Sequence, residues 1–312
     1  MSWTANDIPD QTGRVAVVTG GNGGLGLETV RELARRGAHV VIGARNLEKA
    51  AAATADVTAT VPGASLEVRA LDLGSLAAAR VFAADVIQAH EQIDLLFNNA
   101  GIMATPEWTT ADGFEAQFGT NHLAHFELTR LLLPALERAR AARVVTTTST
   151  ARFQAGGYDL DNPHHRGNYE RWEAYGYSKL ANLQFSIELN RRLSSAGSSV
   201  TAYAADPGLS NTDLQQATAR NLPGSREEKL ARLMPYLGQS PADGALDQLR
   251  AGTDPQATPG LYRPRWVVRG APVRGRVGAK LRRESDLRKL WAVSEQEIGE
   301  ECDVAAIVRS AV

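Results

Sequence analysis

The sequence predicts an α/β fold in which a doubly wound parallel sheet forms a single domain over residues 1–312. Short apolar, β-branched runs alternate with segments of helical length, and this alternation is typical of parallel strands joined by crossover helices. Such connections are right-handed, so we expect helices on both faces of the sheet. No linker rich in Pro, Gly or Ser and no internal repeat divides the chain.

The first predicted strand and helix have the clearest sequence signals. Arg14–Thr19 is a β-branched run that ends in glycines, and Leu25–Arg36 is a helical segment ended by Gly37. The same reasoning predicts further strands at Ala38–Ile42, Ser65–Leu71, Ile93–Phe97, Arg143–Ser149 and Ser199–Ala205. It predicts further helices at Leu47–Thr60, Ser75–His90, Gly113–Arg138 and Tyr175–Ser194.

Two segments read as additions to this domain. Residues 209–241 form an irregular stretch, expected to be a substrate-loop insertion, and residues 263–312 form a basic C-terminal extension. From Arg263 to Lys289 there are ten Lys and Arg residues against only Glu284 and Asp286. A solvated basic surface is the simpler interpretation, and contact with a partner or a membrane surface is the alternative.

Composition excludes several classes of function. The net charge of −1 indicates no nucleic-acid partner. A single cysteine, Cys302, allows no intramolecular disulfide, which fits a reducing cytoplasm. The N-terminus has no apolar region typical of a signal peptide, and no run reaches the length of a transmembrane segment. We expect no metal site, because the only adjacent histidines, His164 and His165, lie in a polar segment expected to be surface loop.

A glycine-rich turn lies between the first strand and the first helix. Glycine lets the backbone turn sharply and approach a pyrophosphate, whose charge then faces the amino terminus of the helix. Thr19 to Gly26 fits T-G-x-x-x-G-x-G through Gly20, Gly24 and Gly26, and fits T-G-x-x-G-x-x-G equally well through Gly20, Gly23 and Gly26. The first spacing is typical of compact reductases and the second of sugar-nucleotide epimerases.

The end of the second strand indicates which dinucleotide binds. A carboxylate there would hold the ribose 2′-hydroxyl of NAD, but the chain has Arg45 instead. A guanidinium can bind a 2′-phosphate with two hydrogen bonds, so we expect NADP(H) rather than NAD(H). Arg45 could alternatively stack on adenine or face solvent. Asp72, after the third strand, could reach the adenine or cap the helix that begins near Ser75.

Tyr175 and Lys179 lie four residues apart on a predicted helix and share a face. A phenol is a poor base at neutral pH, but a nearby ammonium lowers its pKa, so the pair can donate or take a proton. Ser149, at the end of the fifth strand, can hydrogen-bond a substrate oxygen. Tyr177 is not an alternative acid/base of this kind, because the residue four positions later, at position 181, is alanine and not lysine.

In combination these residues resemble the short-chain dehydrogenase/reductase family, whose fold is the Rossmann fold. The likeness runs from about Gly13 to Thr212 and includes N-N-A-G from Asn98 and N-H-L-A-H-F from Asn121. These motifs favour the compact-reductase glycine spacing. The resemblance implies the catalytic residues Ser149, Tyr175, Lys179 and Asn121, with Asn121 holding a water in a proton relay. The expected cofactor-binding residues are Gly20, Asn22, Gly24, Leu25, Gly26, Arg45, Asp72, Leu73, Asn99, Ala100, Gly101, Tyr175, Lys179, Pro207, Gly208 and Thr212.

Within the family the chain is most similar to the retinol-dehydrogenase-like and protochlorophyllide-reductase-like branch. N-N-A-G-I-M, N-H-L-A-H-F, Y-G-Y-S-K-L-A-N and L-W-A-V-S-E carry that likeness. Two features depart from the pattern: the fifth strand reads T-T-T-S rather than ending in paired serines, and no apolar anchor precedes the domain. The resemblance therefore does not imply retinol as substrate.

We expect reversible carbonyl–alcohol oxidoreduction on a small molecule. Apolar and aromatic residues in Ala151–Ala174 and Asp213–Ser240 favour a lipophilic aldehyde or ketone, although such residues can equally pack the loops onto the body. A non-catalytic NADP(H)-binding regulator and a reductase of an activated C=C bond are the alternative hypotheses. Homo-oligomers are common in the family, which is an analogy only.

Overall fold

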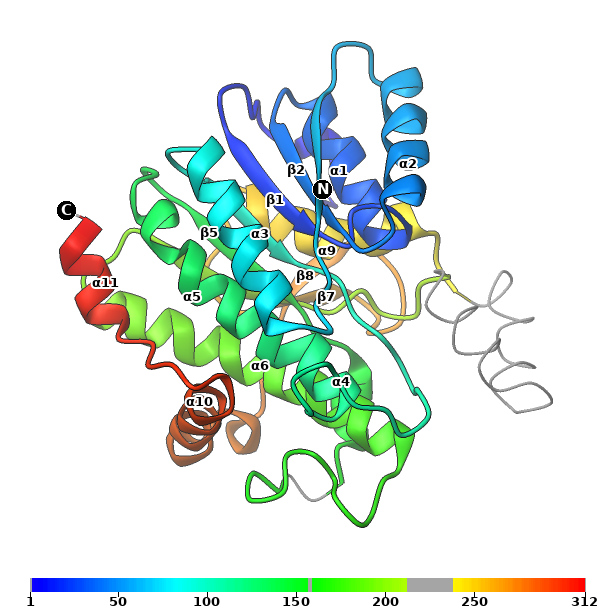
Figure 1. The fold of residues 1–312 in the computed structure, drawn as a ribbon. Helices are drawn as coiled ribbons and strands as arrows, with labels where there is room; N and C mark the ends of the chain where they lie inside the picture. The colour runs from blue at the N-terminus through cyan, green and yellow to red at the C-terminus, as the bar shows by residue number, and fades with distance from the viewer. Residues whose placement is uncertain (1, 157–158, 212–237, 312) are drawn as a thin grey trace.

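The computed structural model describes residues 2–156, 159–211 and 238–311. Its centre is a single sheet of eight strands in the order β3-β2-β1-β4-β5-β6-β7-β8 (Figure 1). The pairings are parallel except for β7 with β8, which is antiparallel. The strands are β1 Val15–Thr19, β2 His39–Ala44, β3 Ser65–Ala70, β4 Leu95–Asn98, β5 Arg143–Thr147, β6 Thr201–Ala205, β7 Leu261–Pro264 and β8 Pro272–Gly275.

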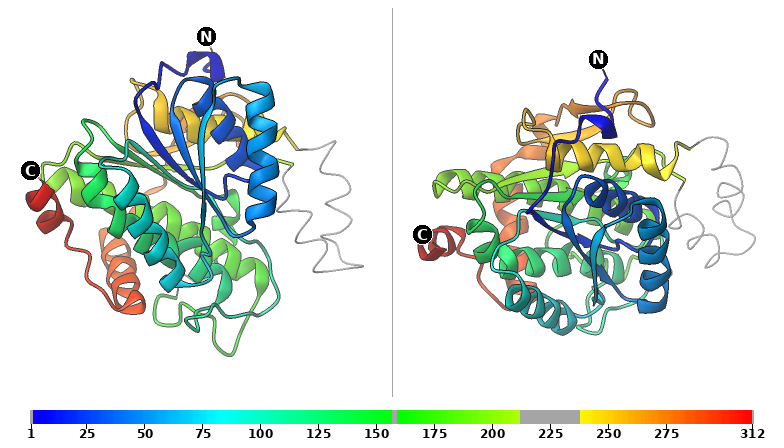
Figure 2. Two further views of the ribbon diagram at one scale, coloured as in Figure 1. Left: turned by 45° about the horizontal axis from the view of Figure 1, so that its top comes forward. Right: turned by 90° about the horizontal axis from the view of Figure 1, so that it is seen from above.

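Helices cover both faces of the sheet (Figure 2). One face carries α1 Gly24–Arg35, α2 Leu47–Thr60 and α9 Pro241–Thr253; the other carries α3 Leu76–Ala89, α5 Ala124–Glu137 and α6 Arg171–Ser195. Further turns of helix are η1 Ala5–Asp7, α4 Ala116–Phe118, the π-helical η2 Gly119–Leu123, η3 Thr150–Gln154 and η4 Ala279–Arg282. The architecture is the predicted doubly wound, Rossmann-like sheet in one domain.

Strand β1 shows why these residues form the centre of the sheet. Ala16, Val17 and Val18 are fully buried. Val17 packs in the core beneath α3, α5 and α6, whereas Ala16 and Val18 pack in the core beneath α1, α2 and α9. A strand whose alternate residues enter two apolar layers must be apolar throughout, as this run is.

The order of the strands reverses its direction between β1 and β4. The chain winds outward from β1 to β3 on one side and from β4 to β7 on the other, so β1 and β4 mark the point where the direction reverses. In such sheets ligands bind beyond the carboxyl ends of the strands at this point. The loops after β1 and β4 are therefore the places to look for a site.

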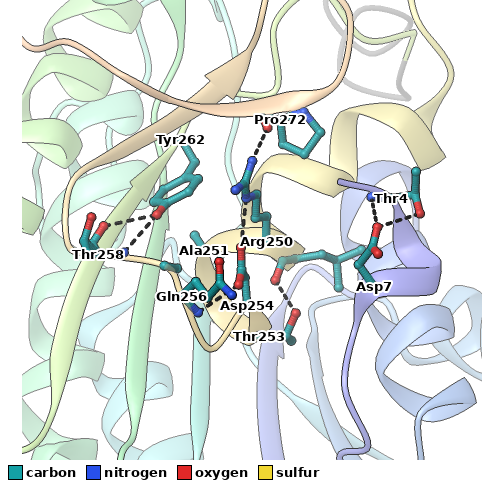
Figure 3. A network of polar contacts seen from close by, with 12 residues as sticks. Thr4, Asp7, Arg250, Ala251, Thr253, Asp254, Gln256, Thr258, Tyr262 and Pro272 are labelled. Carbon is teal, nitrogen blue, oxygen red and sulfur yellow. Dashed lines mark hydrogen bonds and ion pairs between the residues drawn. The ribbon is translucent and has the colours of Figure 1, made fainter. Parts of the chain in front are cut away.

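The structure adds elements beyond the predicted sixth strand. The expected extension at residue 263 starts inside β7, so its first residues are part of the sheet. Figure 3 shows how α9 holds this edge: Arg250 donates to the Asp254 carboxylate at 3.0 Å and to the Pro272 carbonyl at 2.6 Å. Tyr262 of β7 is held by hydrogen bonds to the Thr258 backbone.

The C-terminal residues form α10 Glu284–Ile298 and α11 Val304–Ala311. Trp291 of α10 is buried against Phe126 and Phe185, and Val304 and Val308 of α11 join the same core. The ten basic side chains between residues 263 and 289 are exposed, except for the half-buried Arg263, which agrees with a solvated basic surface. None of the helices in the described parts of the chain is both long and apolar enough for a membrane crossing.

The adjacent histidines His164 and His165 do not lie on the surface, and that expectation is wrong. His164 accepts a hydrogen bond from the Glu115 amide at 3.1 Å and contacts the Glu297 carboxylate at 3.0 Å. His165 is buried against Tyr177. Both rings lie between the loop before α6 and the body, where His164 bonds through both of its nitrogens.

Candidate active site

The turn between β1 and α1 has the backbone form that a phosphate-binding turn needs. Gly20 and Gly24 have φ angles of 67° and 51°, in the left-handed region that favours glycine. A Cβ on Gly26 would lie 2.3 Å from the Gly20 carbonyl oxygen, so no larger residue fits there. Gly23 is extended, with a φ of −179°. The backbone therefore requires the spacing Gly20, Gly24, Gly26, which is the first of the two patterns.

The amino terminus of α1 suits an anion. The N-cap residue, Gly23, offers no side-chain hydrogen bond to the first amide groups, and the first turn contains no acidic residue. Asn22 and Leu25 are half-buried around these amides. A helix end with unsatisfied N–H groups and a positive dipole is a site for phosphate.

The loop after β4 packs directly on this turn. The Thr19 hydroxyl accepts hydrogen bonds from the backbone amides of Asn99 and Ala100 at 2.9 and 3.0 Å, and the Asn99 side chain donates to the Thr19 carbonyl. A Cβ on Gly20 would lie 3.0 Å from that of Ala100. Asn99 and Ala100 therefore fix the loop after β4 against the glycine turn.

Arg45, Asp72 and Leu73 lie beyond the ends of β2 and β3. Arg45 is exposed, and in the described part of the chain its side chain forms no hydrogen bond or ion pair. Asp72 accepts a hydrogen bond from the Gly74 amide at 2.9 Å. The cap of α3 is Ser75, whose hydroxyl accepts from the Ala78 amide, so Asp72 does not have the capping role that was its alternative.

Tyr175 and Lys179 lie on one face of α6, next to Ser149. The amine of Lys179 is 5.8 Å from the centre of the Tyr175 ring and donates to the Thr147 carbonyl at 3.2 Å. Both side chains are buried, at 5% and 3% exposure. Ser149 lies two residues past the end of β5 rather than within it, and its hydroxyl caps η3.

Burial has the largest effect on the pKa values of Tyr175 and Lys179. It raises the pKa of the Tyr175 phenol well above its ordinary value, while a hydrogen bond with Ser149 acts in the opposite direction. Burial also lowers the pKa of Lys179 to about 8, although the Asp206 carboxylate partly offsets this. The expected lowering of the Tyr175 pKa by Lys179 is therefore outweighed by burial, so the phenol is protonated at neutral pH.

Asn121 lies in the π-helical turn η2, not in a regular helix as predicted. Its side-chain amide donates to the Ile102 carbonyl and to Ser178, both at 2.9 Å, and its carbonyl oxygen accepts from the Ile102 amide at 2.8 Å. A Cβ on Gly101 would lie 2.9 Å from that oxygen and 3.3 Å from the Lys179 amine. The structure thus brings Asn121, Gly101 and Lys179 together.

The Asp206-Pro207-Gly208 loop follows β6 at the same edge of the sheet. Gly208 has a φ of 60°, and a Cβ there would lie 2.6 Å from the Val268 carbonyl oxygen. The Pro207 carbonyl accepts hydrogen bonds from Ser210 and Gln239 at 2.7 and 2.8 Å. Thr212, the last expected cofactor contact, lies outside the described residues.

Sequence reasoning missed a buried ion pair that links Ser149 to this loop. Arg152 bonds the Asp206 carboxylate and donates to the Ser149 carbonyl at 2.6 Å. The side chains of Arg152 and Asp206 are 4% and 0% exposed. The other oxygen of Asp206 accepts from the Gly208 amide at 3.0 Å. One guanidinium therefore connects the two loops that flank Tyr175.

Two further residues were missed. A Cβ on Gly176 would lie 2.5 Å from the Ala151 carbonyl oxygen, so glycine next to Tyr175 lets η3 pack on α6. His125 is buried and bridges Thr19 and the Asn121 carbonyl at 2.9 and 3.0 Å. His125 belongs to the N-H-L-A-H-F motif, but the sequence alone does not distinguish its contact with Thr19 from simple core packing.

The aromatic residues of the segment expected to line a pocket differ in their contacts and exposure. Trp172 packs edge-on against the Tyr175 ring, with centroids 6.1 Å apart. The Tyr169 hydroxyl donates to the Thr105 carbonyl and accepts from Gln117, so it packs its loop onto the body. Phe153 is 68% exposed. Tyr158 and most of Asp213–Ser240 lie outside the described residues.

Comparisons with known proteins identify this arrangement. The family model of the short chain dehydrogenases matches residues 14–223. The chain belongs to the short-chain dehydrogenase/reductase family. Human retinol dehydrogenase 13 is 44% identical over 207 residues, which are 66% of this chain and 62% of the human protein. A family member from Armillaria gallica is 40% identical over 265 residues, 82% of this chain and 81% of that protein.

A solved structure has a similar fold over nearly the whole chain. The crystal structure of an uncharacterized protein from Mycobacterium paratuberculosis has a TM-score of 0.78 and 39% identity, covering 97% of this chain and 99% of that one. Likeness to the retinol dehydrogenases confirms the retinol-dehydrogenase-like branch of the short-chain dehydrogenases/reductases expected from the motifs. The chain spans less than two thirds of the length of human retinol dehydrogenase 13.

Proposed function

We propose that this member of the family is an NADP(H)-dependent oxidoreductase that interconverts a carbonyl and an alcohol, with Tyr175 as acid/base and Ser149, Lys179 and Asn121 as its partners. The observation that carries the proposal is the convergence of a buried phenol, a buried amine and a serine hydroxyl beside an anion-binding turn. A protein that only binds a dinucleotide has no need of this set. Lipophilic aldehydes and ketones are the substrate class that we favour.

The residues present fit a nicotinamide dinucleotide. Left-handed φ angles at Gly20 and Gly24 and the close approach of Gly26 to the Gly20 carbonyl form the tight turn that a pyrophosphate needs, and the uncapped start of α1 offers amides to it. An exposed arginine follows β2 where a carboxylate would select NAD, and its guanidinium suits a 2′-phosphate. In this proposal Pro207 and Gly208, in the loop after β6, would meet the nicotinamide end.

The proposed mechanism depends on the protonation states described above. When bound, the reduced nicotinamide supplies the hydride for the carbonyl carbon. Ser149 holds the carbonyl oxygen, and Tyr175, protonated because it is buried, donates its proton to that oxygen as negative charge develops. The Lys179 ammonium stabilises the resulting phenolate. Asn121 holds a water of the proton relay that returns a proton to Tyr175.

The decisive test replaces Tyr175 with phenylalanine and compares it with Tyr177→Phe. Tyr177 lies on the same helix, is equally buried, and donates its hydroxyl hydrogen to the Asp159 carbonyl at 3.0 Å. We expect Tyr175→Phe to reduce kcat on a panel of aldehydes and ketones by at least about 10³-fold, because the proton donor is lost. NADPH affinity, measured by fluorescence titration, should change little.

The Tyr177→Phe enzyme should keep most of its turnover. If Tyr175→Phe retained normal turnover, or if the wild-type protein failed to bind NADPH, the proposal would be overturned. Product analysis with an enone distinguishes reduction of the C=O bond from reduction of the C=C bond. Turnover of no carbonyl in the panel, despite tight NADPH binding, would favour a regulator.

A further inference from the structure

Two imidazoles and a carboxylate meet at the sheet edge formed by β2 and β3. His39 is the first residue of β2, Glu67 lies in the neighbouring strand β3, and His90 is the C-cap of α3. The candidate active site lies beyond the carboxyl ends of the strands, whereas His39 is at the amino end of its strand. This cluster is therefore separate from the proposed oxidoreductase site.

The potential ligand atoms face one another. Glu67 Oε2 lies 3.3 Å from His39 Nε2 and 2.9 Å from His90 Nε2. The three atoms all lie within 4.8 Å of one another, and the two rings are 5.0 Å apart between centroids. The side chains of His39, Glu67 and His90 are 29%, 26% and 15% exposed, so an ion can reach them from solvent.

These separations match a small tetrahedral site. Zinc binds imidazole nitrogen and carboxylate oxygen at about 2.0–2.2 Å, so two ligands of a tetrahedron lie roughly 3.3 Å apart. Both distances from Glu67 Oε2 are close to that value. Three protein ligands leave a fourth position for water. Small rotations of the side chains would suffice to surround an ion.

Neighbouring residues hold the ligands in place. Ser65 Oγ lies 2.7 Å from Nδ1 of His39, which fixes the ring with Nε2 toward the cluster. The Arg69 guanidinium bonds the other oxygen of Glu67, Oε1, and leaves Oε2 for the imidazoles. Metal-binding histidines commonly have such an outer partner on the second nitrogen. A set of side chains that only filled space would not need this orientation.

We propose that His39, Glu67 and His90 bind one divalent transition-metal cation, with Zn²⁺ as the representative ion. Imidazole nitrogen favours Zn²⁺, Ni²⁺ and Cu²⁺, whereas Mg²⁺ and Ca²⁺ favour sites made of oxygen alone. The ligands come from positions 39, 67 and 90, so no short sequence spacing signals the site, which is why the sequence indicated no metal. A bound ion ties β2, β3 and the end of α3 together.

The test is a calorimetric titration of the full chain with ZnCl₂, after removal of any affinity tag and treatment with a chelator. We expect one ion per chain for Zn²⁺ and no binding of MgCl₂. The double variant His39→Gln/His90→Gln should lose the binding. Ser65→Ala should bind about tenfold more weakly, because His39 loses its outer partner. The control is His164→Gln, which removes a histidine that contacts a single carboxylate and should leave the titration unchanged.

Two measurements guard against misfolding of the double variant. Thermal unfolding should show that Zn²⁺ raises the Tm of the wild type and of His164→Gln but not of the double variant. In the folded wild type, Co²⁺ should give the visible absorption of a four-coordinate ion, and Glu67→Gln should weaken it. No Zn²⁺ binding by the wild type, or Zn²⁺ binding that survives the double substitution, would overturn the proposal. NADPH binding and turnover test the other site independently.

Discussion

Lys179 sets a pH limit on the proposed reaction. Burial lowers its pKa to about 8, so the amine is charged below that pH and neutral above it. Only the charged form stabilises the phenolate that Tyr175 becomes on donating its proton. We expect kcat/KM for carbonyl reduction to be level below about pH 8 and to fall above it, when measured from pH 6 to 10 with saturating NADPH.

A Lys179→Met variant should lose that pH-dependent fall as well as most of its activity. The methionine keeps much of the apolar contact of the lysine chain but carries no charge. A rate that continues to fall above pH 8 in this variant would assign the titration to another group.

Arg45 decides between the two coenzymes if it binds the 2′-phosphate. Arg45→Gln removes charge-assisted hydrogen bonds worth about 1.5–3 kcal/mol, so KM for NADPH should rise roughly 10- to 100-fold while KM for NADH changes little. The matched control is Arg35→Gln, in which an exposed arginine at the far end of α1 is neutralised. Equal effects of Arg45→Gln on both coenzymes would indicate that Arg45 stacks on adenine or faces solvent.

The residues that sequence reasoning found and those it missed differ in kind. Tyr175, Lys179 and Gly20 belong to short motifs, and the combination of those motifs indicates the chemistry. Arg152 and Asp206 are 54 residues apart, and their pairing depends on η3 meeting the loop after β6. Pairings between distant segments leave no local pattern, and the same applies to the contact of His125 with Thr19.

At the level of elements, the Arg152–Asp206 pair makes η3 and the β6 loop one unit. Removing one partner of a buried ion pair leaves an uncompensated charge, which typically costs about 3–5 kcal/mol. We expect Arg152→Gln to lower Tm and also to lower kcat, because the guanidinium supports the Ser149 carbonyl. Adding Asp206→Asn should restore much of the stability but not the kcat.

The control for this prediction is Arg130→Gln, which removes one of two arginines from the buried Glu127 on α5, away from η3. It should lower Tm without changing kcat. If Arg152→Gln changed stability alone, as the control does, Arg152 would have no role in positioning Ser149.

Elements with a strong local pattern were predicted, and those without one were not. Five of the six strands up to β6 are mainly apolar and β3 alternates polar with apolar residues, and each of the six lies within a few residues of its expected position. Strands β7 and β8 have four residues each and contain Arg and Pro, so they lack that signal. They extend the sheet beyond β6, and α9 packs across β5 to β8. Helix α10 was not predicted, because it begins within the basic stretch that starts at residue 263.

Across the whole molecule, stability depends on pH through buried groups that oppose each other. Burial lowers the pKa of His125 to about 4 and raises that of Glu115 to about 7. Between pH 6.5 and 4 the unfolded chain binds a proton at His125 that the folded chain does not, so stability falls as pH falls. Between pH 7 and 4.5 the folded chain holds a proton on Glu115 that the unfolded chain releases, so stability rises as pH falls.

The two effects partly cancel near pH 5.5, and variants separate them. One proton changes the free energy of unfolding by about 1.4 kcal/mol per pH unit. We expect His125→Gln to shift the slope of stability against pH between 6 and 5 by up to that amount, toward greater stability at the lower pH, and Glu115→Gln to shift it by a similar amount in the opposite direction. Urea unfolding at a series of pH values measures both slopes. Glutamine keeps one of the two oxygens that now accept from the Gln117 and Phe118 amides. The hydrogen bond that is lost lowers stability at every pH, whereas the lost titration changes the slope. Parallel curves for the wild type and both variants would show that neither buried group couples folding to pH.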